Sequence, residues 1–293
     1  IWDNVYLRAE NEVSIEDGYV TTKLAEGGAA AVAPGFVLKN HGDKALRGVL
    51  KVSIGDFPME MPVSLAARQE CETVMPARLM QNVRLWWPAG YGEQNMYDVR
   101  AEFVADGKVL GKTEFSTGLR EMTYDLSKGI IDFYVNGRRL IGNGGNWGFP
   151  EIYLNYRARE YDAAVAYHAD MNFTMIRNWV GQTADEEFFE ACDRHGVMIW
   201  QDFWLANPWD GPDPDDNPVF MDNALDFVRK IRRHPSIALY CGRNEGYPPT
   251  ELDNGLKALV AEYHPGIVYF PNSADDIVSG HGPYRALPAE MYF

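Results

Sequence analysis

Asn244 and Glu245 occupy a position where a carboxyl group could do chemistry. They follow the apolar segment 237–241 and open a turn rich in glycine and proline that includes Tyr247. An aromatic pocket disfavours the charged form of a carboxyl group, so the group can stay protonated near neutral pH. A protonated carboxyl group can donate its proton to a leaving oxygen. The sequence therefore points to general acid catalysis at the end of this segment.

Two earlier apolar segments also end in polar and aromatic residues. Arg177 and Trp179 close the first segment. Asp202 and Trp204 close the second. Aromatic rings can pack on the C–H face of a sugar while polar groups bind its hydroxyls. We therefore predict that these four residues and Tyr247 bind a sugar substrate, and that Asp202 either bonds a sugar hydroxyl or orients Arg177.

Packing is the alternative to sugar binding for each of the tryptophans. Trp147, Trp179, Trp200 and Trp204 could each lie in the core or in a packed loop instead of stacking on a sugar. Trp200 fits the core best, because it lies inside an apolar segment.

The part of the chain before residue 120 has the pattern of a β-sandwich. Short alternating segments are separated by turn signals at 40–43 and 105–108. This spacing predicts an immunoglobulin-like β-sandwich over residues 11–119. The strands are expected at 30–39, 46–54, 97–104 and 109–115.

After residue 120 the pattern changes to strand, helix, strand. Asn136-Gly137, between two short β segments, predicts a hairpin with a type I′ turn. Strands are expected at 173–179, 197–203, 237–241 and 267–270, with helices at 156–171, 183–195, 222–233 and 251–263. A capping box at Thr183 should open the second helix, and Asp222 or Asn223 should cap the third. Because no Gly-x-Gly-x-x-Gly follows the first strand, a TIM barrel is favoured over a dinucleotide fold, and its sites lie at the carboxyl ends of the strands.

Composition excludes several classes of partner. The net charge of −15 would repel a nucleic-acid backbone, so no nucleic acid is expected. No apolar run reaches the ~18 residues that cross a bilayer, so no membrane partner is expected. Three distant cysteines, together with His195 and His234, give neither a disulfide framework nor the ligand spacing of a metal site. We therefore expect no metal and no cofactor. We interpret the acidic segment 207–217 as a solvated loop, with a cation-binding lid as the alternative.

Several motifs, in order, resemble glycoside hydrolase family 2. They are Leu-Trp-Trp-Pro-Ala-Gly-Tyr-Gly at 85–92, Gly-Leu-Arg at 118–120, Tyr-Val-Asn-Gly at 134–137, His-Pro-Ser-Ile at 234–237, and then Gly242, Asn244 and Glu245. Residues 1–10 resemble the end of the sugar-binding jelly roll that precedes the sandwich in this family. The resemblance implies a retaining, exo-acting β-glycosidase. It also implies that Glu245 is the acid/base and that Asn244 holds the sugar 2-hydroxyl.

One departure from the family concerns its second catalytic carboxylate. Retaining chemistry needs a nucleophile ~5 Å from the acid/base, and no glutamate after residue 270 stands in the family's nucleophile context. Residues 140–293 make roughly 150 residues, against about 250 for a full barrel. We therefore interpret the chain as an internal fragment, with residues 120–293 the first part of a barrel, that does not hydrolyse glycosides unaided. Its expected partners are an oligosaccharide and the missing segments of the parent chain, and a homo-oligomer stays open. The expected location is periplasmic or secreted.

The identity of the sugar rests on a few residues. Gly-His-Gly-Pro-Tyr at 280–284 resembles a loop of exo-β-D-glucosaminidases, and the acidic residues 210–216 could attract the ammonium group of glucosamine. The retained Asn244 instead resembles β-mannosidases and β-galactosidases. The sequence places exo-β-D-glucosaminidase narrowly ahead of β-mannosidase, with β-galactosidase third. A non-catalytic carbohydrate-binding homologue and a scaffold for protein contacts are the alternatives from other classes.

Overall fold

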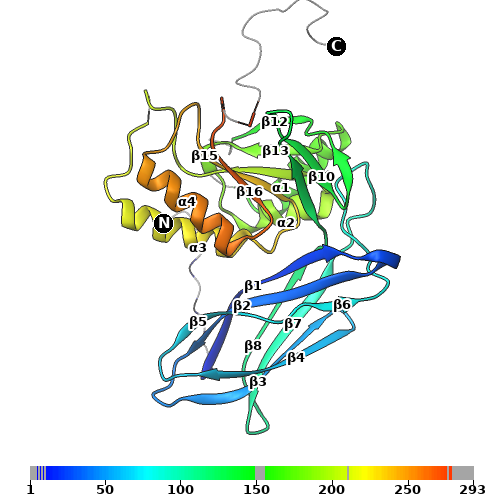
Figure 1. Ribbon diagram of the computed structural model, residues 1–293, viewed down its shortest axis with the longest axis vertical. Coiled ribbons are helices and arrows are strands. Elements are labelled where there is room, and N and C mark those ends of the chain that lie inside the picture. Colours follow the sequence, from blue (N-terminus) through cyan, green and yellow to red (C-terminus); the bar gives the residue numbers. More distant parts are fainter. Residues whose placement is uncertain are drawn as a thin grey trace, which may run out of the picture.

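The computed structural model describes residues 5, 7, 9, 11–148, 156–209, 211–275 and 277–278. Figure 1 shows a β-sandwich at one end of the molecule and a layer of parallel strands and helices at the other. The predicted end of a jelly roll at 1–10 lies almost entirely outside the described residues, and the loop at 280–284 lies outside them as well.

Two antiparallel sheets form the sandwich. One contains β1 (Val13–Leu24), β2 (Ala30–Asn40), β5 (Glu70–Val74) and β6 (Arg78–Met80), with the short turn η1 (Glu26–Gly28) between β1 and β2. The other has the order β4-β3-β7-β8, from β3 (Leu46–Ile54), β4 (Phe57–Leu65), β7 (Tyr97–Ala105) and β8 (Lys108–Thr117). Strand β7 shows the alternation that forms the core, because Val99, Ala101 and Phe103 are buried while the residues between them are exposed. The predicted sandwich is confirmed.

A three-stranded antiparallel sheet leads into the second half. It consists of β9 (Met122–Asp125), β10 (Asp132–Val135) and β11 (Arg138–Leu140), in the order β11-β10-β9. Asn136 and Gly137 join β10 to β11 with φ values of 51° and 76°. Positive φ at both positions is the requirement of a type I′ turn, so the predicted hairpin is confirmed.

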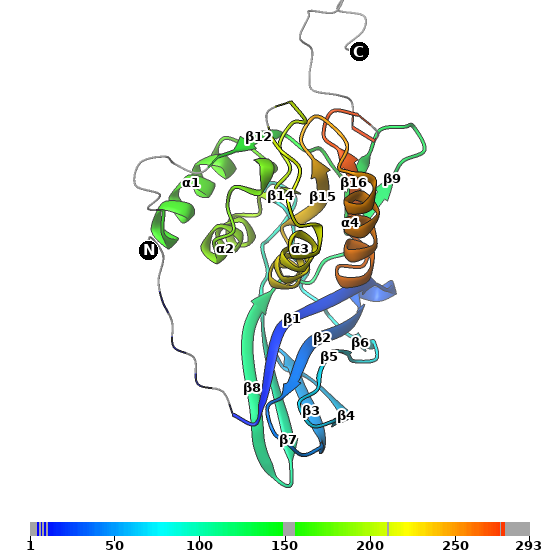
Figure 2. The same cartoon turned by 90° about the vertical axis from the view of Figure 1, so that its left-hand side faces the viewer.

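Five parallel strands follow in chain order. They are β12 (Gly144–Trp147), β13 (Met175–Asn178), β14 (Met198–Asp202), β15 (Ile237–Arg243) and β16 (Val268–Asn272), and each pairs with the next. One face of this sheet is covered by helices (Figure 2), namely α1 (Ala158–Asp170), α2 (Glu186–His195), α3 (Asn217–Ile231) and α4 (Thr250–Tyr263). A strand order that follows the chain belongs to a barrel wall, whereas a doubly wound sheet reverses direction at its switch point. The described strands therefore form part of a TIM barrel, as predicted.

Two helix starts were predicted incorrectly. Helix α2 begins at Glu186 rather than 183, because the hydroxyl of Thr183 accepts a hydrogen bond from the indole of Trp147 (3.1 Å) and makes no cap. Helix α3 begins at Asn217, where Asp216 caps it by accepting a hydrogen bond from the backbone N–H of Val219 (3.0 Å). The proline in the first turn of α3 favours this early start, so Asp222 and Asn223 lie inside the helix.

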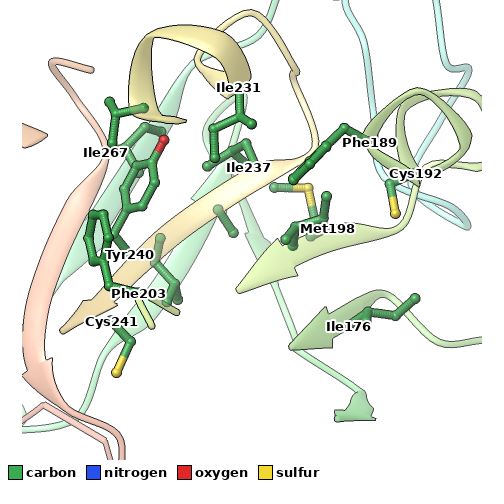
Figure 3. Close-up of a cluster of buried hydrophobic side chains, with 14 of the residues drawn as sticks. Ile176, Phe189, Cys192, Met198, Phe203, Ile231, Ile237, Tyr240, Cys241 and Ile267 are labelled. Atoms are coloured by element: carbon green, nitrogen blue, oxygen red, sulfur yellow. The ribbon is translucent and has the colours of Figure 1, made fainter. Parts of the chain in front are cut away.

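Apolar side chains from the strands and the helices form the second core. Figure 3 shows Met198 of β14, Ile237 of β15, Phe189 of α2 and Ile231 of α3 within one cluster of buried side chains. All four are fully buried. Burying a side chain of this size contributes about 1.5–3 kcal/mol, so this layer holds the helices against the sheet and fixes the strand ends in register.

The sandwich is joined to the base of β15 by buried hydrogen bonds. The guanidinium of Arg120 donates to the carbonyl oxygens of Pro235 (2.8 Å) and Ile237 (2.5 Å). Trp86, the first tryptophan of the Trp-Trp-Pro motif, is fully buried and donates to the backbone carbonyl of Asp193 (2.9 Å). These two motif residues therefore act as structural joints, and they anchor the strand that carries Asn244 and Glu245 at its other end.

His234 lies at this joint between two carboxylates. Its Nδ1 lies 2.6 Å from Asp193 Oδ2 and its Nε2 lies 2.8 Å from Glu186 Oε1. Burial lowers the pKa of His234, but Asp193 and Glu186 outweigh that effect and raise it to about 9. A ring that faces a carboxylate on both nitrogens must carry both protons. His234 is therefore a charged structural residue.

This geometry predicts a pH dependence of stability. The folded-state pKa of about 9 lies above the ordinary value of 6.5, so the stabilisation is fully present below pH 6.5 and is lost as the pH rises through 9. We expect His234→Gln to lower the free energy of unfolding by on the order of 2–3 kcal/mol at pH 6 and by much less near pH 9.5. Urea unfolding at a series of pH values measures this. His41→Gln, in the sandwich, is the control, and a loss for His234→Gln that stays constant from pH 6 to 9.5 would contradict the assignment.

Candidate active site

A cavity of about 800 Å³ opens at the carboxyl ends of the parallel strands. Its polar lining includes Arg177, Asn244 and Glu245, and its aromatic lining includes Trp179 and Trp200. The lining also includes residues of the hairpin, both apolar, such as Phe133 and Leu140, and charged, namely Asp132 and Arg139. Four of the predicted catalytic and substrate-binding residues therefore line one cavity, because parallel strands bring their carboxyl ends to the same edge.

Asn244 is held by its neighbours in a single orientation. Its side-chain oxygen accepts hydrogen bonds from Arg177 Nη2 (2.8 Å), Trp179 Nε1 (3.1 Å) and Ser273 Oγ (3.3 Å). Its side-chain nitrogen donates to Asn207 Oδ1 (2.6 Å). An amide nitrogen carries two hydrogens, and this bond uses one of them. The second hydrogen can be donated to a ligand in the cavity.

Asp202 fixes the guanidinium of Arg177. Arg177 Nε and Nη2 lie 3.0 and 2.7 Å from Asp202 Oδ2, and Asp202 is fully buried. The same carboxylate accepts hydrogen bonds from the backbone of Val180 (2.9 Å) and the indole of Trp200 (2.8 Å). Burial raises the pKa of Asp202, and Arg177 offsets part of that rise. Of the two roles considered for Asp202, this geometry supports the orientation of Arg177.

Trp200 lies on the inner face of the sheet and lines the cavity. The Arg177 guanidinium lies over the Trp200 ring, 5.0 Å from its centre, and the ring of Phe270 makes an edge contact with Trp200, with the ring centres 5.2 Å apart. The sequence favoured the core for Trp200. It is instead half-buried, with part of its surface facing the cavity, because its position in β14 has the same parity as Asp202 and strand side chains alternate between faces.

Glu245 follows the last residue of β15 by two positions and lines the cavity. Its φ is 49°, in the left-handed region, and its backbone N–H donates to Ser273 Oγ (3.0 Å). A non-glycine residue in this region is strained, and such strain persists where surrounding contacts hold it. The bond to Ser273, just past the end of β16, is one contact that holds the backbone of Glu245 in place.

The turn η2 (Trp179–Gly181) contains a second strained residue. Val180 has a φ of 53°, an uncommon value for a β-branched side chain. Its N–H bonds Asp202, while the preceding Trp179 bonds Asn244. The strained turn therefore places an indole on Asn244 and a backbone donor on Asp202.

Three predicted binding residues lie outside the described lining of the cavity: Trp204, Tyr247 and the fully buried Asp202. The Trp204 ring packs against Phe220 and Phe227 of α3, with ring centres 5.7 and 5.4 Å apart. It turns outward because β14 ends at Asp202 and the chain bends away from the inner face. Tyr247 is half-exposed, and its hydroxyl donates to Asp275 Oδ2 (3.1 Å).

The sequence did not identify several lining residues. Asn146 lies on β12, Asn207 lies in the loop after β14, and Ser273 lies just past β16. Asn146 could have been found from the rule that placed Arg177, since the two pair in the sheet register. Asn207 and Ser273 reach the cavity through loops, whose paths the strand pattern does not predict.

Some carboxylates of the acidic segment 207–217 form hydrogen bonds within the protein. Arg243 Nη1 donates to Asp213 Oδ1 (2.5 Å), and Asp216 caps α3. Asp210 lies outside the described residues. Two of the acidic groups proposed to attract an ammonium therefore have protein partners.

The described residues hold no cluster of three or more metal-binding side chains. Among the helices of the described ranges, none combines the length and apolar character that crossing a membrane requires.

A sandwich followed by a barrel wall, with an Asn-Glu pair at its rim, can be compared with known proteins. The model of glycosyl hydrolases family 2 matches residues 13–120. The mannosylglycoprotein endo-β-mannosidase of Lilium longiflorum is 30% identical over 88% of the chain and 29% of its own length. The exo-β-D-glucosaminidase of Streptomyces avermitilis is 26% identical over 99% of the chain and 35% of its own length.

Solved structures have the same fold. The exo-chitosanase CsxA of Amycolatopsis orientalis superimposes with a TM-score of 0.82 at 20% identity, over 91% of this chain and 33% of that one. The β-D-mannosidase of Dictyoglomus thermophilum gives 0.76 at 23% identity, over 91% and 35%. The chain belongs to glycosyl hydrolases family 2 and spans about a third of the length of these relatives.

The strain at Val180 is testable. Glycine adopts a φ of 53° without steric cost, whereas valine there costs about 1–3 kcal/mol, and the greater freedom of glycine in the unfolded chain offsets up to ~1 kcal/mol. We expect Val180→Gly to raise the free energy of unfolding by about 1 kcal/mol in thermal or urea unfolding. Val180→Ala keeps the strain and should give no gain. A Val180→Gly protein less stable than Val180→Ala would show that the turn is not strained.

Proposed function

We propose that the chain is the part of a retaining β-glycosidase that carries the general acid/base, and that Glu245 has this role. The observation that carries the proposal is the position of Glu245 at a cavity beside Asn244, whose orientation is set by Arg177, Trp179 and Asn207. A carboxyl group there can reach the oxygen of a glycosidic bond while the amide binds a hydroxyl of the same sugar.

The proposed chemistry has two steps. In the first, Glu245 donates its proton to the leaving oxygen as the glycosidic bond breaks and a nucleophilic carboxylate bonds the anomeric carbon. In the second, Glu245 takes a proton from water, whose oxygen displaces the nucleophile and restores the original configuration. The free N–H of Asn244 would hold the sugar hydroxyl, and this bond strengthens as positive charge develops on the ring.

The nucleophile is assigned to a segment of the longer protein. Among the described residues that line the cavity, the other carboxylate is Asp132, at the hairpin end. Arg139 bonds it at 2.6 Å and Lys128 at 3.2 Å. Arg139 lowers the pKa of Asp132. Asp132 thus has a structural role, and the chain's span of about a third of its relatives is consistent with a nucleophile contributed from elsewhere.

We rank a β-mannoside ahead of a β-glucosaminide as the substrate. The acidic groups Asp213 and Asp216 have partners in the protein, which weakens the argument for an ammonium-bearing sugar. Several relatives named β-mannosidase and the lily endo-β-mannosidase support a mannoside. The glucosaminide stays the second candidate, because the relative aligned over nearly the whole chain is named exo-β-D-glucosaminidase.

The role of Glu245 predicts a dependence on the leaving group. In the full-length protein, we expect Glu245→Gln to lower kcat/KM at least about a thousandfold for an oligosaccharide, whose leaving oxygen needs a proton. A 2,4-dinitrophenyl glycoside needs no proton, so its glycosylation step should stay within about tenfold of wild type in burst kinetics. Glu262→Gln, an exposed glutamate on α4, is the control.

The same substrates are prepared as β-mannosides and β-glucosaminides, and the wild type should prefer the mannosides. Equal losses for both leaving groups would contradict the role of Glu245. Binding of oligosaccharides by the wild type without turnover of any glycoside would favour a non-catalytic homologue.

A further inference from the structure

Two aromatic side chains are exposed on loops that contribute other residues to the cavity lining. Trp209 is 84% exposed and Tyr247 is 51% exposed. Each follows a cavity-lining residue by two positions: Trp209 follows Asn207, and Tyr247 follows Glu245. Tryptophan is highly buried on average, so an exposure of 84% is unusual for this residue type.

The loops that carry these two rings contact each other. The backbone N–H of Asn244 donates to the carbonyl of Leu205 (2.9 Å), and the side chain of Asn244 bonds that of Asn207. A Cβ atom on Gly246 would lie 2.5 Å from Pro208 Cγ. Pro208 and Gly246 are the direct neighbours of the two aromatic residues, so Trp209 and Tyr247 lie next to the line along which the loops meet.

A buried arginine holds the tryptophan loop in place. Arg243, the last residue of β15, is 3% exposed. Its Nε donates to the carbonyl of Ala206 (2.8 Å) and its Nη2 to the carbonyl of Gly211 (3.1 Å). Its Nη1 bonds Asp213. These bonds bracket Trp209 on both sides, so an exposed ring is carried on a loop fixed to the strand that ends at Glu245.

We propose that Trp209 and Tyr247 form a binding platform for the leaving-group sugar. The inference rests on the proposed role of Glu245. A general acid faces the glycosidic oxygen, and the leaving group lies on the far side of that oxygen from the cleaved sugar. An aromatic ring next to the acid can pack on the C–H face of this second sugar. The substrate class is therefore a β-linked oligosaccharide, and the platform recognises its second residue.

The test compares two substrates with the same cleaved sugar in the full-length protein. An oligosaccharide places a sugar on the platform, whereas a glycosyl fluoride places nothing there. We expect Trp209→Ala to lower kcat/KM for the oligosaccharide about tenfold and to leave the fluoride within about twofold. Trp209→Tyr keeps a ring and should lose less than about threefold. Tyr167→Ala, which removes an exposed ring from α1, is the control.

A binding measurement separates this inference from the function on which it rests. In the Glu245→Gln background, calorimetry should show that Trp209→Ala weakens the oligosaccharide about tenfold while the affinity for the monosaccharide stays unchanged. Equal losses on both substrates, or no loss on either, would overturn the platform while leaving Glu245 as the acid/base. A wild type that hydrolyses the fluoride but binds the oligosaccharide no better than the monosaccharide would also overturn it. A wild type that cleaves no glycoside would overturn both.

Discussion

The candidate active site depends on the buried ion pair between Arg177 and Asp202. Asp202 has no exposed surface, so without Arg177 its charged form would lose its cationic partner and keep only the hydrogen bonds from Val180 and Trp200. Without Asp202, the guanidinium would have no fixed position from which to bond Asn244. Buried ion pairs gain little net stability, because desolvation offsets most of the attraction. The pair is better understood as an orienting device: Asp202 fixes Arg177, and Arg177 fixes the amide that lies beside Glu245.

Two residues at the rim of the cavity have strained backbone conformations that hydrogen bonds hold in place. Val180 and Glu245 both adopt left-handed backbone conformations, and each is held by a bond to a residue of another strand end. Such conformations cost free energy that the rest of the fold must supply. At the opposite end of β15, Arg120 donates a hydrogen bond to the carbonyl oxygen of Pro235, just before the strand begins. His234 lies nearby, between the carboxylates of Asp193 and Glu186. The strand that carries Glu245 is therefore anchored at its base and strained at its end, a distribution expected where function rather than stability selects the geometry.

The sequence was sufficient for the parts that follow from local patterns. Apolar segments ending in Arg177, Asp202 and Asn244 predicted strand ends, and parallel pairing then brought these residues together. Side chains alternate between the two faces of a strand, so the position of Trp200 two residues before Asp202 could also have placed it on the inner face. The apolar character of the segment alone suggested the core instead.

Other features depend on contacts that a local pattern does not contain. Trp204 has the inward parity of Asp202, yet the strand ends first and the ring packs on α3. The residues from Thr183 onward have the sequence pattern of a capping box. The Thr183 hydroxyl nevertheless accepts a hydrogen bond from the indole of Trp147, 36 positions earlier. The loop residues Asn207 and Ser273 depend on backbone contacts for their positions at the cavity. Arg243 bonds the carbonyl of Ala206, next to Asn207, and the backbone N–H of Ser273 bonds the carbonyl of Arg243.

The central claim is that Glu245 acts as the acid/base of a retaining enzyme, and chemical rescue tests it most directly. In a Glu245→Ala variant of the full-length protein, the glycosyl-enzyme formed from a 2,4-dinitrophenyl β-glycoside has no base to activate water. Azide needs no base, and it would enter from the face that Glu245 vacated. We expect azide to restore turnover and the product, identified by NMR, to be the β-glycosyl azide. An α-glycosyl azide would make Glu245 the nucleophile, and no rescue at all would remove it from the chemistry.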